Sequence, residues 1–191
     1  KDRRIDTLAF DPQSKSFVII EYKRERNSSV IDQGFTYLSL MLQNQADFIL
    51  EYNETQAGNL KRNDVDWSQT KVVFVSQGFT PNQREAVNFK DLSIELWEVK
   101  RYENDSVFIT PIRKSHASAS IKTVMQNSPE FKEVTEKIKE YSEENLLKGK
   151  SDDVVELYES YKNAILNLNT EIEVKPQKWY ISFKKANSHI C

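Results

Sequence analysis

The stretch from residue 4 to residue 43 constrains the fold most, because two strand patterns lead directly into a helix pattern. The run Ser16–Lys23 is rich in Phe, Val and Ile, as strands are. The run 4–10 is also apolar, and the turn-forming residues 11–15 separate the two runs, so we expect a β-hairpin. The segment Val30–Gln43 is apolar nearly all round, which predicts a helix buried against the sheet.

This order of elements brings polar side chains toward one another. Side chains alternate along a strand, so Glu21 and Lys23 share one strand face. Pairing across the hairpin can place Asp6 near Glu21, although the sequence leaves the strand register open. Gln33 and Tyr37 are four residues apart and share one face of the predicted helix. The sequence therefore predicts a polar site at which carboxylate, amine, amide and phenol groups meet.

The residue types at this site suit a divalent metal. Asp6 and Glu21 supply the hard oxygen ligands that Mg²⁺ and Mn²⁺ prefer. Such an ion lowers the pKa of a bound water and stabilises charge on a phosphoryl oxygen. Lys23 is suited to position or deprotonate that water, or to neutralise developing charge. Gln33 is suited to orient Lys23 or the substrate, and Tyr37 to bond a phosphate.

Each of these residues also has a simpler interpretation when taken alone. Asp6 would more often be a surface carboxylate, and Glu21 with Lys23 an exposed cross-strand ion pair of small energetic value. Gln33 would more often be a solvated helix residue, and Tyr37 a partly buried core residue. Their order and spacing together favour a site, which can be either catalytic or a degenerate binding scaffold on the same fold.

The ordered motifs resemble the PD-(D/E)XK nuclease superfamily, with Asp6 as the first acid and Glu21-Tyr22-Lys23 as the ExK element. The spacing of Gln33 and Tyr37 is similar to that of RecB-like nucleases and of archaeal endonucleases that act on mismatched or branched DNA. Closer still is a bacterial and archaeal family labelled "predicted transport protein". The resemblance covers about residues 1–113, through RRIDTLA at 3–9, IIEYK at 19–23, ADF at 46–48, DWS at 66–68 and a strand–Thr–helix–strand tail over 72–96.

The resemblance implies a restriction-endonuclease-like fold, a mixed sheet flanked by helices. It implies hydrolysis of phosphodiester bonds in DNA, in repair or defence, with Mg²⁺ or Mn²⁺ held by Asp6, Glu21 and the main-chain carbonyl of Tyr22. A homodimer is one arrangement it allows, since related nucleases often pair subunits. The family's core opens with a helix that can supply another acid, and we expect that helix to precede Lys1. The alternative is a non-catalytic module that binds nucleic acid or protein.

Net charge does not indicate a general nucleic-acid binder, because the chain carries a formal charge of −2. Affinity for DNA would have to come from local clusters. One cluster, Lys23 with Arg24 and Arg26, lies beside the predicted site. We interpret the other, Lys100 with Arg101, as ordinary solvated surface.

Cysteine and histidine usage fits a protein of the reducing cytoplasm. Cys191 is the single cysteine, so a disulfide framework within the chain is excluded. His116 and His189 lie far apart in the sequence, which argues against a zinc site. No apolar run approaches membrane-spanning length and no signal peptide is visible, so we expect no membrane contact and find no support for a transport role.

The rest of the first domain, residues 1–113, follows an α/β pattern. The short apolar run Lys71–Ser76 predicts an interior strand, and Thr80 is placed to cap a helix over 81–89. Two further strands are predicted over 94–99 and 106–112. The intervening segment 47–52 is assigned either to a continued helix or to a short strand. The expected result is a mixed sheet with helices.

A Ser-rich linker over 114–128 leads to a small α+β accessory domain, residues 129–191, that we expect to be incomplete. Its predicted elements are a helix over 129–147, a second helix capped by Ser151, and a strand or hairpin over 172–183 with Pro176 at the turn. In the second helix we expect an inward face made of Val154, Val155, Leu157, Tyr158, Tyr161, Ile165 and Leu168.

Overall fold

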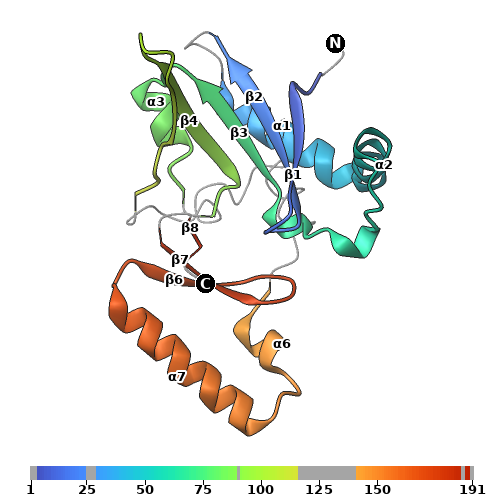
Figure 1. Cartoon of the computed structure of the whole chain (residues 1–191), viewed down its shortest axis with the longest axis vertical. Helices are drawn as coiled ribbons and strands as arrows, with labels where there is room; N and C mark the ends of the chain where they lie inside the picture. The colour runs from blue at the N-terminus through green and yellow to red at the C-terminus, as the bar shows by residue number, and fades with distance from the viewer. Residues whose placement is uncertain (1–3, 25–28, 90, 116–140, 186–187, 190–191) are drawn as a thin grey trace. The chain divides into compact units, whose positions relative to one another are not determined.

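The computed structural model describes residues 4–24, 29–89, 91–115, 141–185 and 188–189. The chain forms two compact units, Lys1–Lys139 and Glu140–Cys191. The first contains a five-stranded sheet and the second a three-stranded sheet (Figure 1). The prediction of a mixed α/β protein is confirmed. The predicted linker, 114–128, lies almost wholly outside the described residues.

The sheet of the first unit has the strand order β1-β2-β3-β4-β5. The strands are β1 (Thr7–Asp11), β2 (Ser16–Lys23), β3 (Lys71–Ser76), β4 (Ile94–Arg101) and β5 (Val107–Pro111). β2, β3 and β4 are parallel, whereas β1 and β5 run antiparallel at the two edges. The predicted hairpin is therefore confirmed, and its register pairs Thr7 with Ile20 and Leu8 with Ile19.

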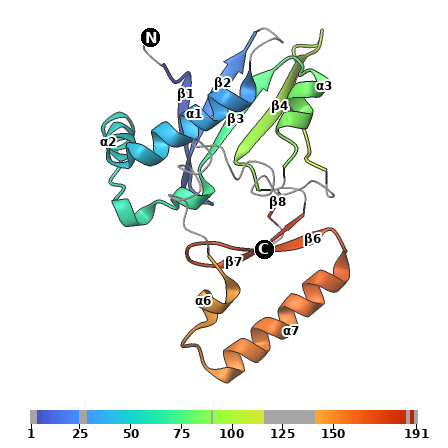
Figure 2. The same ribbon diagram turned by 180° about the vertical axis from the view of Figure 1, so that it is seen from behind.

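Three helices connect these strands: α1 (Val30–Gln43), α2 (Gln45–Gln56) and α3 (Pro81–Ala86). The connections from β2 to β3 and from β3 to β4 cross in the same direction, and parallel crossovers are right-handed, so α1 and α3 cover the same sheet face. Figure 2 shows α1 lying across that face. The segment 47–52 belongs to a separate helix, because both the main-chain and side-chain nitrogens of Asn44 bond the Leu40 carbonyl and end α1.

The capping residues explain where two of these helices begin. The Ser29 hydroxyl accepts a hydrogen bond from the Asp32 main-chain nitrogen at the start of α1. Thr80 and Gln83 form a reciprocal capping box at the start of α3. The predicted helix over 81–89 is too long, since α3 ends at Ala86 and Val87 turns into the core.

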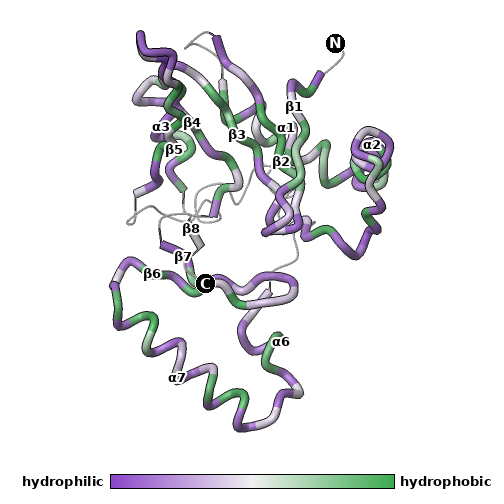
Figure 3. Tube along the Cα trace, in the orientation of Figure 1, coloured by the Kyte–Doolittle hydropathy of each residue, from purple (hydrophilic) through white to green (hydrophobic). Residues whose placement is uncertain are grey.

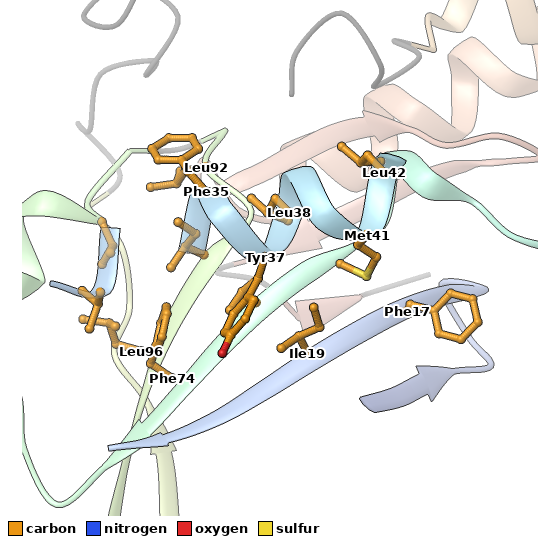
Figure 4. Packing of buried hydrophobic residues seen from close by; sticks show 14 of the residues in the cluster. Phe17, Ile19, Phe35, Tyr37, Leu38, Met41, Leu42, Phe74, Leu92 and Leu96 are labelled. Carbon is orange, nitrogen blue, oxygen red and sulfur yellow. The ribbon is translucent and has the colours of Figure 1, made fainter. Parts of the chain in front are cut away.

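The core of the first unit lies between α1 and the sheet. Phe17, Ile19 and Phe74 from the strands meet Leu38 and Met41 from the helix, and all five are almost fully buried (Figure 4). This contact holds the helix, and with it Gln33 and Tyr37, against β2.

Gly34 allows the close approach of α1 to β4. A Cβ atom at this position would lie 2.9 Å from Cγ1 of Ile94 and closer still to its Cδ1. The sequence indicates only that a glycine weakens the helix. In the structure, the missing side chain is the reason that the helix can pack tightly against the sheet.

The DWS motif at 66–68 has a structural role at the other end of β2. The carboxylate of Asp66 accepts hydrogen bonds from the nitrogen and the hydroxyl of Ser68, and the Asp66 nitrogen bonds the Lys15 carbonyl. The Trp67 ring lies 5.5 Å from that of Phe17. Two short 3₁₀ helices, η1 (Arg62–Asp64) and η2 (Trp67–Gln69), thereby join the loop after α2 to the hairpin turn.

The second unit contains α6 (Glu143–Leu147), α7 (Asp152–Leu168), β6 (Ile172–Pro176), β7 (Ile181–Lys185) and β8 (Ser188–His189). The predicted hairpin is confirmed, but Pro176 is the last residue of β6 and residues 177–180 form the turn, closed by the Gln177 nitrogen on the Tyr180 carbonyl. Of the predicted 129–147 helix only residues 141–147 are described, and there a continuous helix is wrong: Tyr141 and Ser142 are not helical, and Ser142, with extended backbone, caps the separate short helix α6 by accepting a hydrogen bond from the Asn145 nitrogen.

The predicted inward face of α7 is partly wrong. Val154, Leu157, Tyr161 and Leu168 are exposed, and only Val155, Tyr158 and Ile165 of the expected set are partly covered. Figure 3 shows hydrophobic and hydrophilic residues alternating along the helix. The expected residues form one apolar stripe of α7, with Val155 to its side, and periodicity alone does not tell which part of such a stripe its neighbours cover.

Candidate active site

The predicted polar residues converge where β2 ends. Glu21 lies on the face of β2 that α1 covers, in the same row as Phe74 of β3 and Leu96 of β4. Its side chain follows Phe17 and Ile19 on that face and is only 8 % exposed as a residue. A carboxylate so deeply placed among apolar neighbours requires hydrogen-bond partners, and three side chains supply them.

Lys23 is the cationic partner of Glu21. Its Nζ lies 3.3 Å from Oε1 of Glu21 and donates a short hydrogen bond to Oε1 of Gln33. The ammonium also lies 5.6 Å from the centre of the Phe74 ring. The sequence suits Gln33 to orient Lys23 or the substrate, and the structure brings the side chains of Gln33 and Lys23 into direct contact.

Gln33 and Tyr37 bind Glu21 from the helix side. Nε2 of Gln33 donates to Oε1 of Glu21 at 2.9 Å and to the Tyr37 hydroxyl at 3.1 Å. The Tyr37 hydroxyl in turn lies 3.2 Å from Oε2 of Glu21 and 3.1 Å from the Arg4 carbonyl, to either of which it can donate. Figure 4 shows this hydroxyl pointing from α1 toward the strands.

Burial raises the pKa of Tyr37, and the nearby negative charge of Glu21 raises it further despite the hydrogen bond from Gln33. The phenol therefore remains a hydrogen-bond donor over the whole physiological pH range. With 3 % exposure, Tyr37 contacts Glu21 and the main chain, which places it as an orienting residue and leaves little of its surface for a phosphate.

Asp6 completes the cluster from the neighbouring strand. It precedes β1 in the position opposite Glu21, since Thr7 pairs with Ile20. Its Oδ2 accepts a hydrogen bond from the Tyr22 main-chain nitrogen at 3.0 Å, so the side chain extends the hairpin beyond its last main-chain pair. Unlike Glu21, Asp6 is exposed.

The oxygen atoms at the site can be counted as ligand positions. A carboxylate has about four acceptor positions. Among the described residues, Oε1 of Glu21 accepts hydrogen bonds from Lys23 and Gln33, and Oε2 has one neighbouring donor, the Tyr37 hydroxyl. Oε2 therefore keeps capacity for a cation, as does the exposed carboxylate of Asp6. Within the part of the chain that the structure describes, no three Asp, Glu, His or Cys side chains form a metal-binding group. A cation here would rest on two carboxylates, which is a common arrangement for Mg²⁺ with its retained waters.

The predicted basic contacts are only partly described. Arg24 is exposed directly after β2, and Arg26 lies outside the described residues. One partner escaped the sequence interpretation: the Arg4 main-chain carbonyl lies within hydrogen-bond distance of the Tyr37 hydroxyl, and no side-chain pattern in the sequence indicates a main-chain contact.

Comparison with known proteins gives a relative without an assigned activity. An uncharacterized protein of Haemophilus influenzae is 55 % identical over 185 residues, which is 97 % of this chain and 61 % of that protein. The chain thus spans about three fifths of the relative's length. No protein-family model and no solved structure matches the chain. Among the residues that the structure describes, no helix is long and apolar enough to cross a membrane.

Proposed function

We propose that this chain contains the active site of a metal-dependent nuclease of the PD-(D/E)XK type, which hydrolyses phosphodiester bonds in DNA. The observation that carries the proposal is the convergence of Asp6, Glu21 and Lys23 at the end of one hairpin, with Gln33 and Tyr37 holding Glu21 and Lys23 from the following helix.

The surrounding fold supports this assignment. The β1–β2 hairpin carries both acids, α1 follows it and packs on it, and β3 then pairs with β2 in parallel. This is the arrangement that a restriction-endonuclease-like core requires around an acid–acid–lysine set. The proposal therefore extends from the site to the fold family.

Each residue has a role that its position permits. Asp6 and Oε2 of Glu21, with the Tyr22 carbonyl, would hold Mg²⁺ or Mn²⁺. A divalent ion bound there would supply Lewis-acid activation of water and of the phosphodiester. Lys23 holds positive charge beside the reacting phosphate and orients water through its remaining protons. Gln33 fixes Lys23, and the protonated Tyr37 fixes the carboxylate of Glu21.

Cleavage of DNA by matched variants tests the proposal. Glu21→Gln keeps the shape of the side chain and removes its charge, and Lys23→Gln removes the ammonium. With Mn²⁺ or Mg²⁺ and labelled single-stranded, duplex and branched DNA, we expect each variant to lose at least about 100-fold in cleavage rate. In calorimetry, Mn²⁺ should bind the wild-type protein and not Glu21→Gln.

The opposite sheet face offers a matched control. Lys71 and Glu95 form an ion pair at 3.2 Å on the face that α1 does not cover, and Trp97 donates to the same carboxylate. Lys71→Gln and Glu95→Gln should leave cleavage and Mn²⁺ binding unchanged. Cleavage by Glu21→Gln at the wild-type rate would overturn the proposal. So would the absence of both metal binding and cleavage in the wild type, which would favour a binding scaffold.

A further inference from the structure

Most of the apolar stripe of α7 faces solvent. Val154 is 45 % exposed, Leu157 58 %, Tyr161 62 % and Leu168 77 %. These residues follow one another at intervals of three, four and seven positions, so their side chains lie along one side of the helix. Exposed apolar side chains that are scattered singly are ordinary, but a row of four on one helix indicates an interaction surface.

The contacts of α7 within the second unit lie to one side of this row. Among the described residues, Glu143 of α6 bonds Tyr158 and Lys162, and α7 also packs against β6. The partly covered residues Val155, Tyr158, Lys162 and Leu166 are centred about a third of a turn around the helix from the exposed row. The second unit therefore uses one side of α7 and leaves the row accessible to a partner.

The row has the same apolar pattern when it is read in either direction. Tyr161 is its centre, and apolar residues follow at four and seven positions on both sides. These are Leu157 and Ile165, then Val154 and Leu168. A two-fold axis at Tyr161 would set each residue of the row against an apolar residue of a second copy. A surface that pairs with itself in this way is what a two-fold symmetric dimer requires.

The charges of α7 favour an antiparallel arrangement of two copies. The first half of the helix carries four acids, whereas residues 163–170 are uncharged. Two parallel helices would bring the acids of one copy beside those of the other, which like-charge repulsion disfavours. With a two-fold axis at Tyr161, every acid instead lies opposite an uncharged residue of the segment 163–170. The four acids are Asp152, Asp153, Glu156 and Glu159.

The length of the row sets the expected strength of such a dimer. The 17 residues of α7 span about 25 Å. Two helices paired along that length bury on the order of 1,000 Å² in total, which is near the lower limit for a specific interface. Ser160 and Ala164 flank Tyr161 and are small enough to leave room for the ring of the second copy. We therefore expect a reversible dimer with a dissociation constant in the micromolar range.

We propose that α7 is the interface of a two-fold symmetric dimer, in which the exposed rows of two copies pack antiparallel across Tyr161. The partner is a second copy of this chain, because the apolar spacing is self-complementary and the antiparallel pairing opposes no like charges. The inference is independent of the proposed nuclease function, since α7 belongs to the second unit and the Glu21–Lys23 site to the first.

Sedimentation velocity over a range of micromolar concentrations tests for the dimer. Tyr161→Glu would place two negative charges together at the axis. We expect it to weaken dimerisation by about 10-fold or more, because a central aromatic residue commonly contributes that much to an interface. Leu157→Glu should act in the same direction. Both side chains are exposed, so neither substitution should unfold the second unit, and circular dichroism checks this.

Leu50→Glu is the matched control, because Leu50 lies on α2 of the first unit and is about as exposed as Leu157. It should dimerise as the wild type does. A wild type that stays monomeric over the whole range would overturn the inference, as would equal dimerisation of wild type and Tyr161→Glu. Hydrogen-exchange protection of α7 should rise with protein concentration. Protection that does not depend on concentration would assign the row to another segment of the same chain, and would also overturn the inference.

Disulfide trapping tests the antiparallel orientation. In a Cys191→Ser background, Val154→Cys and Leu168→Cys are prepared separately and then mixed with the thiol oxidant diamide. The mixture should form a disulfide between positions 154 and 168. Val154→Cys alone should form none, because its two copies would lie about 21 Å apart along the paired helices. A disulfide in Val154→Cys alone, with none between 154 and 168 in the mixture, would overturn the antiparallel interface.

Discussion

Glu21 shows how a charged side chain is accommodated in an apolar row of the sheet. Its neighbours in register are Phe74 and Leu96, yet it receives hydrogen bonds from Lys23, Gln33 and Tyr37. A buried charge with these partners is stable only while the network is complete, because removal of one donor leaves the carboxylate undersatisfied. The same network that stabilises Glu21 also fixes its orientation.

Tyr37→Phe should therefore destabilise the first unit by about 1 kcal/mol, because it removes the hydroxyl between Glu21, Gln33 and the Arg4 carbonyl and leaves the ring in place. Urea unfolding measures the change. Tyr22→Phe is the control, since Tyr22 is exposed on the opposite sheet face, and it should remain within about 0.5 kcal/mol of wild type. An equal effect of the two substitutions would contradict this account of Tyr37.

Gly34→Ala should also destabilise the protein, although alanine favours helices. Helix propensity contributes about 1 kcal/mol in favour of alanine. The new Cβ would collide with the Ile94 side chain, and such overpacking costs about 1 to 3 kcal/mol. Ile94→Val removes the Cδ1 atom that lies nearest. In a double-mutant cycle from urea unfolding, the double variant should be more stable than the sum of the single effects predicts, and strict additivity would contradict the proposed clash.

At the level of elements, the two units differ in how well their helices are packed. Seven residues of α1, from Val30 to Leu42, are buried against the sheet, whereas α7, which is described throughout, has no fully buried residue. Polar contacts also join α7 to its neighbour. The Glu143 carboxylate of α6 accepts hydrogen bonds from Tyr158 at 2.5 Å and Lys162 at 2.6 Å, and these contacts join α6 to α7.

The hydrogen bonds of Glu143 with Tyr158 and Lys162 predict that the stability of the second unit depends on pH. Burial alone would raise the pKa of Glu143, but hydrogen bonds from Lys162 and Tyr158 lower it below its usual value. A carboxyl whose pKa is lowered by folding stabilises the native state above its unfolded pKa, and this stabilisation disappears as pH falls through the folded pKa. The hydrogen bond to Glu143 raises the pKa of Lys162, so its contribution disappears only as pH rises through that higher value.

The second unit should accordingly lose stability between about pH 5 and pH 3. Hydrogen exchange of α7 peptides measures the loss. Glu143→Gln should lower protection at pH 7 and flatten the pH dependence, whereas Glu144→Gln, at an exposed neighbouring position, should leave both unchanged. An unaltered pH profile in Glu143→Gln would assign the dependence to other groups.

At the scale of the whole molecule, the chain combines a well-packed unit that holds the candidate site with a smaller unit of thin core. The first unit contains the continuous cluster that surrounds Phe17, Ile19, Phe74 and Leu38. In the second unit, Ile172 and Phe183 are the buried apolar residues among those described. A ligand of the site should therefore stabilise one unit selectively, because it binds the native form of that unit alone.

Mn²⁺ should increase hydrogen-exchange protection of β1 and β2 and leave α7 unchanged. At a concentration 100 times the dissociation constant, the expected stabilisation is about 2.7 kcal/mol. Glu21→Gln should abolish the effect, and Glu95→Gln, on the opposite sheet face, should preserve it. Equal protection of both units by Mn²⁺ would contradict a site confined to the first.

Local sequence patterns predicted the bounds of an element correctly where the element's own sequence defines the face that it buries. The bounds of β2, α1 and β3 agree with the runs Ser16–Lys23, Val30–Gln43 and Lys71–Ser76, because each run ends at residues that break its pattern or cap a helix. Patterns were insufficient for α7, where periodicity identifies an apolar stripe but most of that stripe is exposed, because its coverage depends on residues distant in the chain.

The sequence by itself determined the order of elements, the mixed α/β class and the residue types of the candidate site, because all three depend on short-range periodicity and composition. Only the tertiary structure decided that Asp6 lies opposite Glu21 and that the Tyr37 hydroxyl contacts Glu21 and the Arg4 carbonyl. These contacts join residues far apart in the chain. They depend on strand register and on the close approach at Gly34, which are fixed by packing across the whole sheet.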